Sequence, residues 1–249
     1  MKHVRGFAAS TTLVPLLGML LGDCGAPPGQ PRSESIARAP SDVMEFDVLY
    51  ADNCAGCHGV NGRGGAAIAL ANPVYLAVVD ERSMRTTIAD GVRGTSMPAF
   101  AQRAGGMLTE NQIDALVDGI RKRSSRPADL TGTNPPPYAP TSAGDVHRGA
   151  VAYQTFCRWC HGPDGQGGAK GSAITNDSFL ALVSDQALRT MVIVGRPDLG
   201  GPDWRRSAGR PMSDQEVTDV VSWLASHRVS APGQPYVTDR SGSGAPRVE

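Results

Sequence analysis

The sequence predicts an all-α protein that consists of two copies of one small domain. Residues 54–66, CAGCHGVNGRGGA, align without a gap with residues 157–169, CRWCHGPDGQGGA, and a one-residue shift keeps the two halves in register beyond that point. Internal similarity of this kind indicates tandem duplication. Apolar residues recur at helical spacing, and no stretch alternates over the length of a strand, so we expect helices alone.

Each copy is predicted to start with a helix that leads into a pair of cysteines and to carry a second helix further on. The leading helix places an aromatic residue, Tyr50 or Tyr153, one turn before the first cysteine of its copy. Residues 81–90 and 185–194 read as the middle helix of each copy. The repeat therefore extends to the order of its helices.

Each copy is also predicted to end in an amphipathic helix. Thr109 and Ser213 are hydroxyl N-caps, followed three residues later by Gln112 and Glu216. This spacing is that of a capping box, in which the N-cap and the third helical residue satisfy each other's backbone N–H groups. The sequence therefore sets the start of both closing helices.

The domain boundaries follow from the repeats and from the composition between them. The linker contains three consecutive prolines, which predict a semi-stiff, extended spacer. We assign residues 1–24 to a signal peptide, 25–41 to a flexible tether, 42–123 to the first domain, 124–143 to a Pro-rich linker, 144–229 to the second domain and 230–249 to a disordered polar tail.

The N-terminus has the layout of an export signal. Lys2 and Arg5 precede a mostly apolar run, residues 7–22, that is shorter than the roughly 20 residues needed to cross a bilayer comfortably. The run ends in LLGDC, which resembles a bacterial lipoprotein signal, although Asp23 stands where that pattern has a small residue. We expect an exported, periplasmic protein. Cys24 is either lipidated, which would anchor the chain to a membrane, or removed with the signal.

The composition argues against nucleic-acid binding and suggests a cofactor. The formal net charge is zero, which does not fit a nucleic-acid-binding protein with its basic face. Aromatic residues make up only 5% of the chain, whereas it has 30 glycines and 19 prolines. Small domains with so few large apolar side chains often need a covalent cross-link or a bound cofactor to stabilise their core.

Two cysteine pairs carry the chemistry of the sequence. Both have the spacing Cys-Xaa-Xaa-Cys followed at once by histidine: Cys54, Cys57 and His58, and Cys157, Cys160 and His161. On a helical turn, two such thiols can add to the two vinyl groups of one haem, while the next imidazole faces the iron; this is the c-type haem attachment signature. A redox dithiol would need a βαβ context, and one shared zinc would explain neither the histidines nor the duplication.

With these motifs, the chain resembles the class I cytochrome c family, in particular its two-domain dihaem members. The resemblance covers about residues 42–122 and 144–228, and it includes the aromatic residue of the leading helix, a Met-Pro-Xaa-Phe loop and the closing helix. It implies two cytochrome c domains, each a few helices around one covalently attached haem c. It also implies His58 and His161 as proximal iron ligands and Met97 as the second axial ligand of the first haem. Met/His ligation raises the reduction potential.

The second loop departs from the family pattern. It reads GRPDLGGPDWR from residue 195, and Gly201 stands where the first copy has Met97. Three outcomes are open: the second iron has an open or water-filled position, another residue reaches it, or a partner protein supplies the ligand. Met212 is the foremost substitute, although it aligns with Leu108 at a packing position; Met191, His227 and Lys170 are further candidates.

We expect a periplasmic dihaem cytochrome that transfers single electrons and is not an enzyme. The resemblance suggests redox partners such as a quinol-oxidising complex, a terminal oxidase or a periplasmic dehydrogenase, with membrane association through the N-terminus. The alternative is a peroxidase-like enzyme or a gas sensor that uses an open iron position in the second domain. The loop arginines, Arg196, Arg205, Arg206 and Arg210, would suit haem propionates or carboxylates of a partner.

Overall fold

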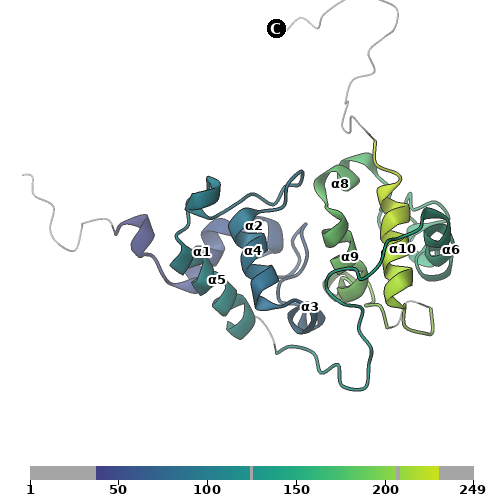
Figure 1. The fold of residues 1–249 in the computed structure, drawn as a ribbon, viewed down its shortest axis with the longest axis horizontal. Helices are drawn as coiled ribbons and strands as arrows, with labels where there is room; N and C mark the ends of the chain where they lie inside the picture. The colour runs from purple at the N-terminus through teal and green to yellow at the C-terminus, as the bar shows by residue number, and fades with distance from the viewer. Residues whose placement is uncertain (1–37, 124–125, 206–207, 230–249) are drawn as a thin grey trace, which may run out of the picture. The chain divides into compact units, whose positions relative to one another are not determined.

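The computed structural model describes residues 38–123, 126–205 and 208–229 (Figure 1). The helices described there belong to one compact unit, Pro40–Glu249. The described residues form helices, turns and isolated bridges but no β-strand, which confirms the all-α prediction. The predicted signal peptide, Cys24, most of the tether and the C-terminal tail lie outside the described residues.

The first half begins with the 3-10 helix η2 (Pro40–Asp42) and continues with five α-helices and a second 3-10 helix. In chain order these are α1 (Phe46–Asn53), α2 (Ala55–His58), α3 (Pro73–Val78), α4 (Glu81–Asp90), η3 (Gln102–Ala104) and α5 (Glu110–Arg123). The predicted capping box starts α5: the Gln112 backbone N–H donates to Thr109 Oγ1 over 3.3 Å, and the Thr109 N–H donates to Gln112 Oε1 over 2.9 Å.

The second half repeats these elements in the same order. They are α6 (Val146–Phe156), α7 (Arg158–His161), α8 (Asp177–Leu182), α9 (Asp185–Val194), the 3-10 helix η4 (Pro197–Leu199) and α10 (Asp214–Ala225). The middle helices, α4 and α9, have the predicted bounds. A capping box between Ser213 and Glu216 starts α10, as the sequence indicates.

The leading and closing helices cross in both halves, and each crossing pairs an aromatic residue with a glycine. In the first half, a Cβ on Gly119 would lie 1.9 Å from Cδ2 of Phe46. In the second half, a Cβ on Gly149 would lie 2.1 Å from the Asp219 carbonyl oxygen and 2.7 Å from Cβ of Trp223. Phe46 aligns with Gly149, and Gly119 aligns with Trp223, so the two halves place the glycine on opposite helices of the same crossing.

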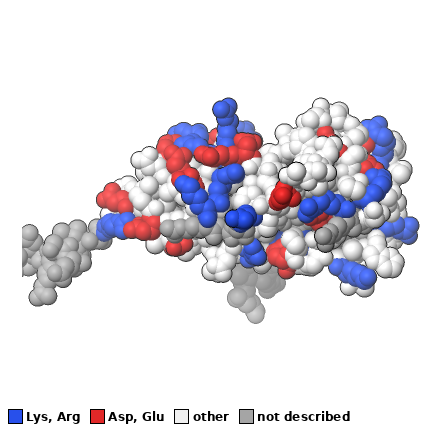
Figure 2. All heavy atoms as spheres, turned by 90° about the horizontal axis from the view of Figure 1, so that it is seen from below, with Lys and Arg blue, Asp and Glu red and all other residues white. Residues whose placement is uncertain are grey.

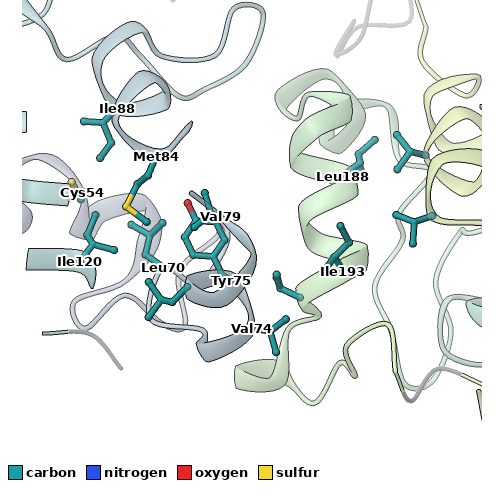
Figure 3. Packing of buried hydrophobic residues seen from close by; sticks show 14 of the residues in the cluster. Cys54, Leu70, Val74, Tyr75, Val79, Met84, Ile88, Ile120, Leu188 and Ile193 are labelled. Atoms are coloured by element: carbon teal, nitrogen blue, oxygen red, sulfur yellow. The ribbon is translucent and has the colours of Figure 1, made fainter. Parts of the chain in front are cut away.

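Apolar side chains from both halves form the core. Figure 3 shows Cys54, Met84 and Ile120 gathered in the first half, with Leu188 and Ile193 along α9 of the second. Helices α3 and α9 are neighbours, and Asn72 Nδ2, at the start of α3, donates to the Val194 carbonyl oxygen over 3.0 Å. Asn72 is buried, so this hydrogen bond joins the halves away from water.

The linker packs against both domains. The sequence predicted an extended spacer and did not predict these contacts. The Ala128 N–H donates to the Pro73 carbonyl over 2.8 Å. Further on, the buried Arg189 of α9 donates through Nη2 to the Pro137 carbonyl over 2.8 Å, and Gln186 Nε2 donates to the Tyr138 carbonyl over 2.7 Å. Prolines lack an N–H, but their carbonyls still accept, and α9 uses one of them to hold the linker.

Candidate functional site

Each cysteine pair and its histidine lie on one short helix that follows the leading helix. Cys54 ends α1 and caps α2, and Cys157 stands in the same way between α6 and α7. The His58 N–H donates to the Cys54 carbonyl over 2.9 Å, and the His161 N–H donates to the Cys157 carbonyl over 3.0 Å. One helical turn therefore presents both thiols and the imidazole, which is the arrangement that haem attachment requires.

Both histidines are held by a backbone carbonyl. Nδ1 of His58 lies 2.8 Å from the Ile68 carbonyl oxygen, and Nδ1 of His161 lies 2.7 Å from the Ser172 carbonyl oxygen. A carbonyl oxygen can only accept, so Nδ1 carries the proton in each ring and Nε2 keeps the lone pair that binds iron. Burial lowers the pKa of His58 below its ordinary 6.5 and so favours the neutral ring, although the hydrogen bond with the Ile68 carbonyl acts in the opposite direction.

These two carbonyl acceptors were not identified from the sequence. Any residue type offers a backbone carbonyl, so only the path of the chain after the histidine selects Ile68 and Ser172. That path depends on tight glycine turns: a Cβ on Gly65 would lie 2.2 Å from the Cys57 carbonyl oxygen and 2.6 Å from the His58 carbonyl carbon. The glycines after each motif could have signalled this close return of the chain.

The first cysteine of each pair does not have the lowered pKa of a catalytic thiol. Burial, and secondarily the neighbouring Cys57, raises the pKa of Cys54 to about 11, and burial with Cys160 raises that of Cys157 to about 12. Catalytic dithiols have a lowered thiol pKa instead. Nor does the described part of the chain bring together three His, Cys, Asp or Glu side chains that could hold a metal ion, as a zinc site would require.

A tyrosine of the leading helix braces each motif. The Tyr50 hydroxyl donates to the Gly59 carbonyl over 3.0 Å, and the Tyr153 hydroxyl donates to the Gly162 carbonyl over 2.5 Å. Both acceptors follow the histidine directly. The two aromatic residues noted from the sequence therefore fix the end of the haem-binding turn in each half.

The first loop, residues 91–100, presents Met97 from a closed backbone turn. The Val92 N–H donates to the Met97 carbonyl over 3.0 Å, and the Met97 N–H donates to Thr95 Oγ1 over 3.1 Å. Gly91 has a φ of +65°, and a Cβ there would lie 2.5 Å from the Ala99 nitrogen. Met97 is only partly buried, and its loop is fixed on both sides of it.

The second loop, residues 195–204, has the same backbone conformation as the first but different side chains. The Arg196 N–H donates to the Gly201 carbonyl over 3.1 Å, as Val92 does to Met97. Gly195 has the same φ of +65°, and a Cβ there would lie 2.8 Å from the Asp203 nitrogen, which matches Ala99. Gly201 therefore occupies the backbone position of Met97, as the repeat predicts, and it brings no side chain.

Met212 has the position of Leu108. Its N–H donates to the Trp204 carbonyl over 2.9 Å, and the Leu108 N–H donates to the Phe100 carbonyl over 2.8 Å. Both side chains are buried, with exposed fractions of 3% and 5%. This geometry favours the packing interpretation of Met212 that the sequence left open beside the ligand interpretation.

Three of the four loop arginines that we considered for propionates pair with carboxylates of this chain. Arg196 pairs with Asp198, Arg205 with Asp203 and Arg210 with Glu216. Arg206 lies outside the described residues. On the face that Figure 2 presents, atoms of basic and acidic residues are intermixed, in keeping with such pairing.

The pair of Arg196 and Asp198 also joins the two halves, and we call it the interdomain clamp. The Gly64 N–H donates to Asp198 Oδ2 over 3.0 Å, and Arg196 Nη2 donates to the Gly65 carbonyl over 2.8 Å. Arg196 also binds Asp198 through Nε over 3.0 Å. Sequence reasoning missed the clamp. The sequence feature that could have indicated it is the pair of charged residues, Arg196 and Asp198, at the positions where the first loop has Val92 and Gly94.

The donors present in each half fit a covalently attached haem c. Two thiols and one imidazole share a helical turn, and the ring is held with Nε2 available. In the first half, the thioether of Met97 completes the set of donors that the sequence predicted. In the second half, the matching loop position offers none.

Comparison with known proteins assigns both halves to haem-protein families. A family model described as cytochrome C oxidase, cbb3-type, subunit III matches residues 41–118, and one described as cytochrome c matches residues 146–228. The Cbb3-type cytochrome c oxidase subunit CcoP of Azospirillum sp. (strain B510) is 32% identical over 129 residues, which cover 47% of this chain and 38% of the relative. The subunit FixP of Azorhizobium caulinodans is 28% identical over 183 residues, which cover 70% of this chain and 55% of the relative. The chain thus spans between 38% and 55% of the length of these two curated relatives.

Proposed function

The chain belongs to the cytochrome c family and carries two of its domains, each with a covalently bound haem c, in tandem; on this premise we propose that it is a periplasmic carrier of single electrons. The observation that carries the proposal is the matched pair of motifs, in which two cysteines and a carbonyl-held histidine share one turn. A haem c bound there would supply reversible one-electron chemistry at its iron.

The residues of the chain would hold each haem and limit rearrangement around it. Cys54 and Cys57, or Cys157 and Cys160, would form the thioether links, and His58 or His161 would bind iron through Nε2. Met97 would be the second axial ligand of the first haem, where a thioether favours the reduced state and raises the potential. The hydrogen bonds that brace the histidines would keep the ligand geometry the same in both oxidation states.

The interdomain clamp supports passage of electrons from one domain to the other. It joins Gly64 and Gly65, which follow the first haem motif, to the loop of the second domain that faces its own haem in this family. Asn72 and Val194 add a buried contact between the same halves. Segments next to the two haem sites therefore touch directly, so the protein would work as a two-haem wire.

A terminal oxidase is the partner that we propose for the outgoing electron. The family model that matches residues 41–118 and the relatives from Azospirillum and Azorhizobium are described as subunits of cbb3-type oxidases. A quinol-oxidising complex or a periplasmic dehydrogenase would supply the electron. We further propose export and attachment to the membrane through the N-terminus, on the basis of the basic residues, the apolar run and the LLGDC stretch of the sequence. In the part of the chain that the structure describes, no helix is long and apolar enough to cross a bilayer.

The test combines haem counting with electron delivery. The purified full-length protein should contain two haems in a pyridine haemochrome assay. After reduction, it should be reoxidised in air faster by membranes that contain a cbb3-type oxidase than by membranes from a strain without it, and Met97→Ala should slow this reaction. A haem count below two would contradict the attachment sites. Equal rates with both membranes would contradict the oxidase as partner.

A further inference from the structure

We propose that the iron of the second domain keeps an exchangeable sixth position that binds small neutral ligands of the carbon monoxide or nitric oxide type. The proposal rests on haem attachment at Cys157, Cys160 and His161 as given above. It goes beyond electron transfer, because it gives the second domain a ligand-binding site that the first domain lacks.

The first step is that the second loop keeps its shape without its ligand. The hydrogen bond between the Arg196 N–H and the Gly201 carbonyl repeats the one between Val92 and Met97. The Gly201 N–H also donates to the Arg196 carbonyl over 2.8 Å, which closes the turn a second time. The loop therefore holds glycine in the place of the ligand instead of collapsing into a new form.

The second step is that Met212 is committed elsewhere. Its backbone is tied to Trp204, and its side chain is 3% exposed within the core, in the position that Leu108 fills in the first domain. Leucine cannot bind iron, so this position has an apolar packing role that both halves share. Trp204 is itself 1% exposed, which limits any movement of the segment that Met212 would need.

The third step is that the other candidate ligands are also engaged. His227 Nδ1 lies 2.8 Å from the Trp223 carbonyl, and its ring packs edge-on against the Trp223 ring. The ammonium of Lys170 lies 4.8 Å above the centre of the Trp159 ring. Met191 is packed against the core from α9. Met191 and Lys170 would have to leave these contacts to reach the iron. For His227 the restraint is the packing of its ring against Trp223, since a carbonyl at Nδ1 leaves Nε2 able to bind iron, as in His58 and His161.

The fourth step is that the interdomain clamp holds the loop from outside. Asp198 and Arg196 bind the backbone of Gly64 and Gly65, and their side chains are 10% and 17% exposed. A rearrangement of the loop around Gly201 would have to release these contacts with the first domain. The clamp thus holds the loop in the form that places Gly201, which has no side chain, at the backbone position of Met97.

The side chains of the loop favour the binding of a neutral ligand at the iron and do not favour peroxide cleavage. Its carboxylates, Asp198 and Asp203, are each paired with an arginine, and Arg196 holds the pKa of Asp198 down at about 2. Neither carboxylate is therefore poised as the general acid or base that peroxide cleavage requires. A neutral diatomic ligand needs no proton transfer to bind ferrous iron, so it is the class of ligand that fits this site.

The test titrates the purified dihaem protein with carbon monoxide after reduction with dithionite and follows the absorption of the haems. The wild-type protein should bind one equivalent per two haems. Met97→Ala should bind two, because it opens the first iron, and Gly201→Met should bind none. Haem counts and helical circular dichroism would show that each variant is loaded and folded.

Two results would overturn the proposal. One is a wild-type protein that binds no carbon monoxide at either haem. The other is a Met212→Leu variant that binds more than the wild type, since this would make Met212 the sixth ligand. Both results are compatible with two haems that still pass electrons to the oxidase, so failure of this proposal is distinguishable from failure of the proposed function.

Discussion

The loops at residues 91–100 and 195–204 share a backbone frame and differ in what the frame holds. Both open on a glycine with a φ of +65° and close through the same hydrogen bond, from Val92 to Met97 and from Arg196 to Gly201. The first loop offers a thioether. The second offers glycine at that point and uses Arg196 and Asp198 to bind the first domain. The backbone frame therefore forms with or without a methionine at this position, and in the second loop it carries contacts with the first domain.

The largest expected effect comes from removing one haem attachment. Replacing Cys157 and Cys160 together by alanine should halve the haem count and destabilise the second domain, because a covalently held haem would be part of the core of so small a domain. The pyridine haemochrome assay and circular dichroism check this. The matched control replaces Cys54 and Cys57, and should leave the second haem in place. Retention of two covalent haems in either variant would contradict the claim that each cysteine pair attaches one haem.

The next effect concerns the interdomain clamp. Asp198→Asn removes a charged partner from Arg196, and hydrogen bonds to charged groups contribute about 1.5–3 kcal/mol each. The variant should therefore separate the two domains more readily at neutral pH, visible as a larger radius of gyration in small-angle scattering. The matched control is Glu216→Gln, which breaks a carboxylate pair with Arg210 inside the second domain and should leave the radius unchanged.

The clamp should also depend on pH in a defined direction. Arg196 lowers the pKa of Asp198 from 3.8 to about 2, so the folded form favours the charged carboxylate. The stabilisation is fully present above pH 3.8 and is lost as the pH falls toward 2. The difference in stability between the wild type and Asp198→Asn should accordingly shrink over this range. A constant difference down to pH 2 would show that the charge of Asp198 does not hold the domains.

The smallest effect distinguishes the two helix crossings. Gly149→Ala places a Cβ 2.1 Å from a backbone oxygen of α10, and overpacking of this kind costs about 1–3 kcal/mol. Gly119→Ala meets only the ring of Phe46, which is partly buried and can turn aside, so it should cost less. Denaturant unfolding of the two variants checks this order. Equal losses would mean that the exchange of glycine and aromatic between helices has no energetic consequence.

The sequence predicted the parts of the fold that residue type encodes locally. Capping residues at Thr109 and Ser213 set the starts of α5 and α10. The predicted bounds of α4 and α9 coincide with side-chain N-caps and with a glycine at each C-terminus. The repeat also placed Gly201 opposite Met97 correctly. The helix bounds depend on residues close together in the chain, and the tandem repeat supplies two examples of each pattern.

What the sequence could not supply depends on contacts between distant segments. The Ile68 and Ser172 carbonyls that hold the histidines have no residue-specific signal. The linker prolines suggested a spacer, yet the Pro137 carbonyl accepts from Arg189, which lies in α9. Arg196 suggested propionate or partner contacts, and together with Asp198 it binds the first domain instead.

A spectroelectrochemical redox titration of the wild type and Met97→Ala would test the central claim most directly. The account predicts two separate one-electron steps in the wild type, with the higher potential at the methionine-ligated first haem. Met97→Ala should lower that step alone and leave the other unchanged. A single unresolved step in the wild type, or a Met97→Ala variant with both potentials unchanged, would contradict the claim that the two loops give the two haems different ligands.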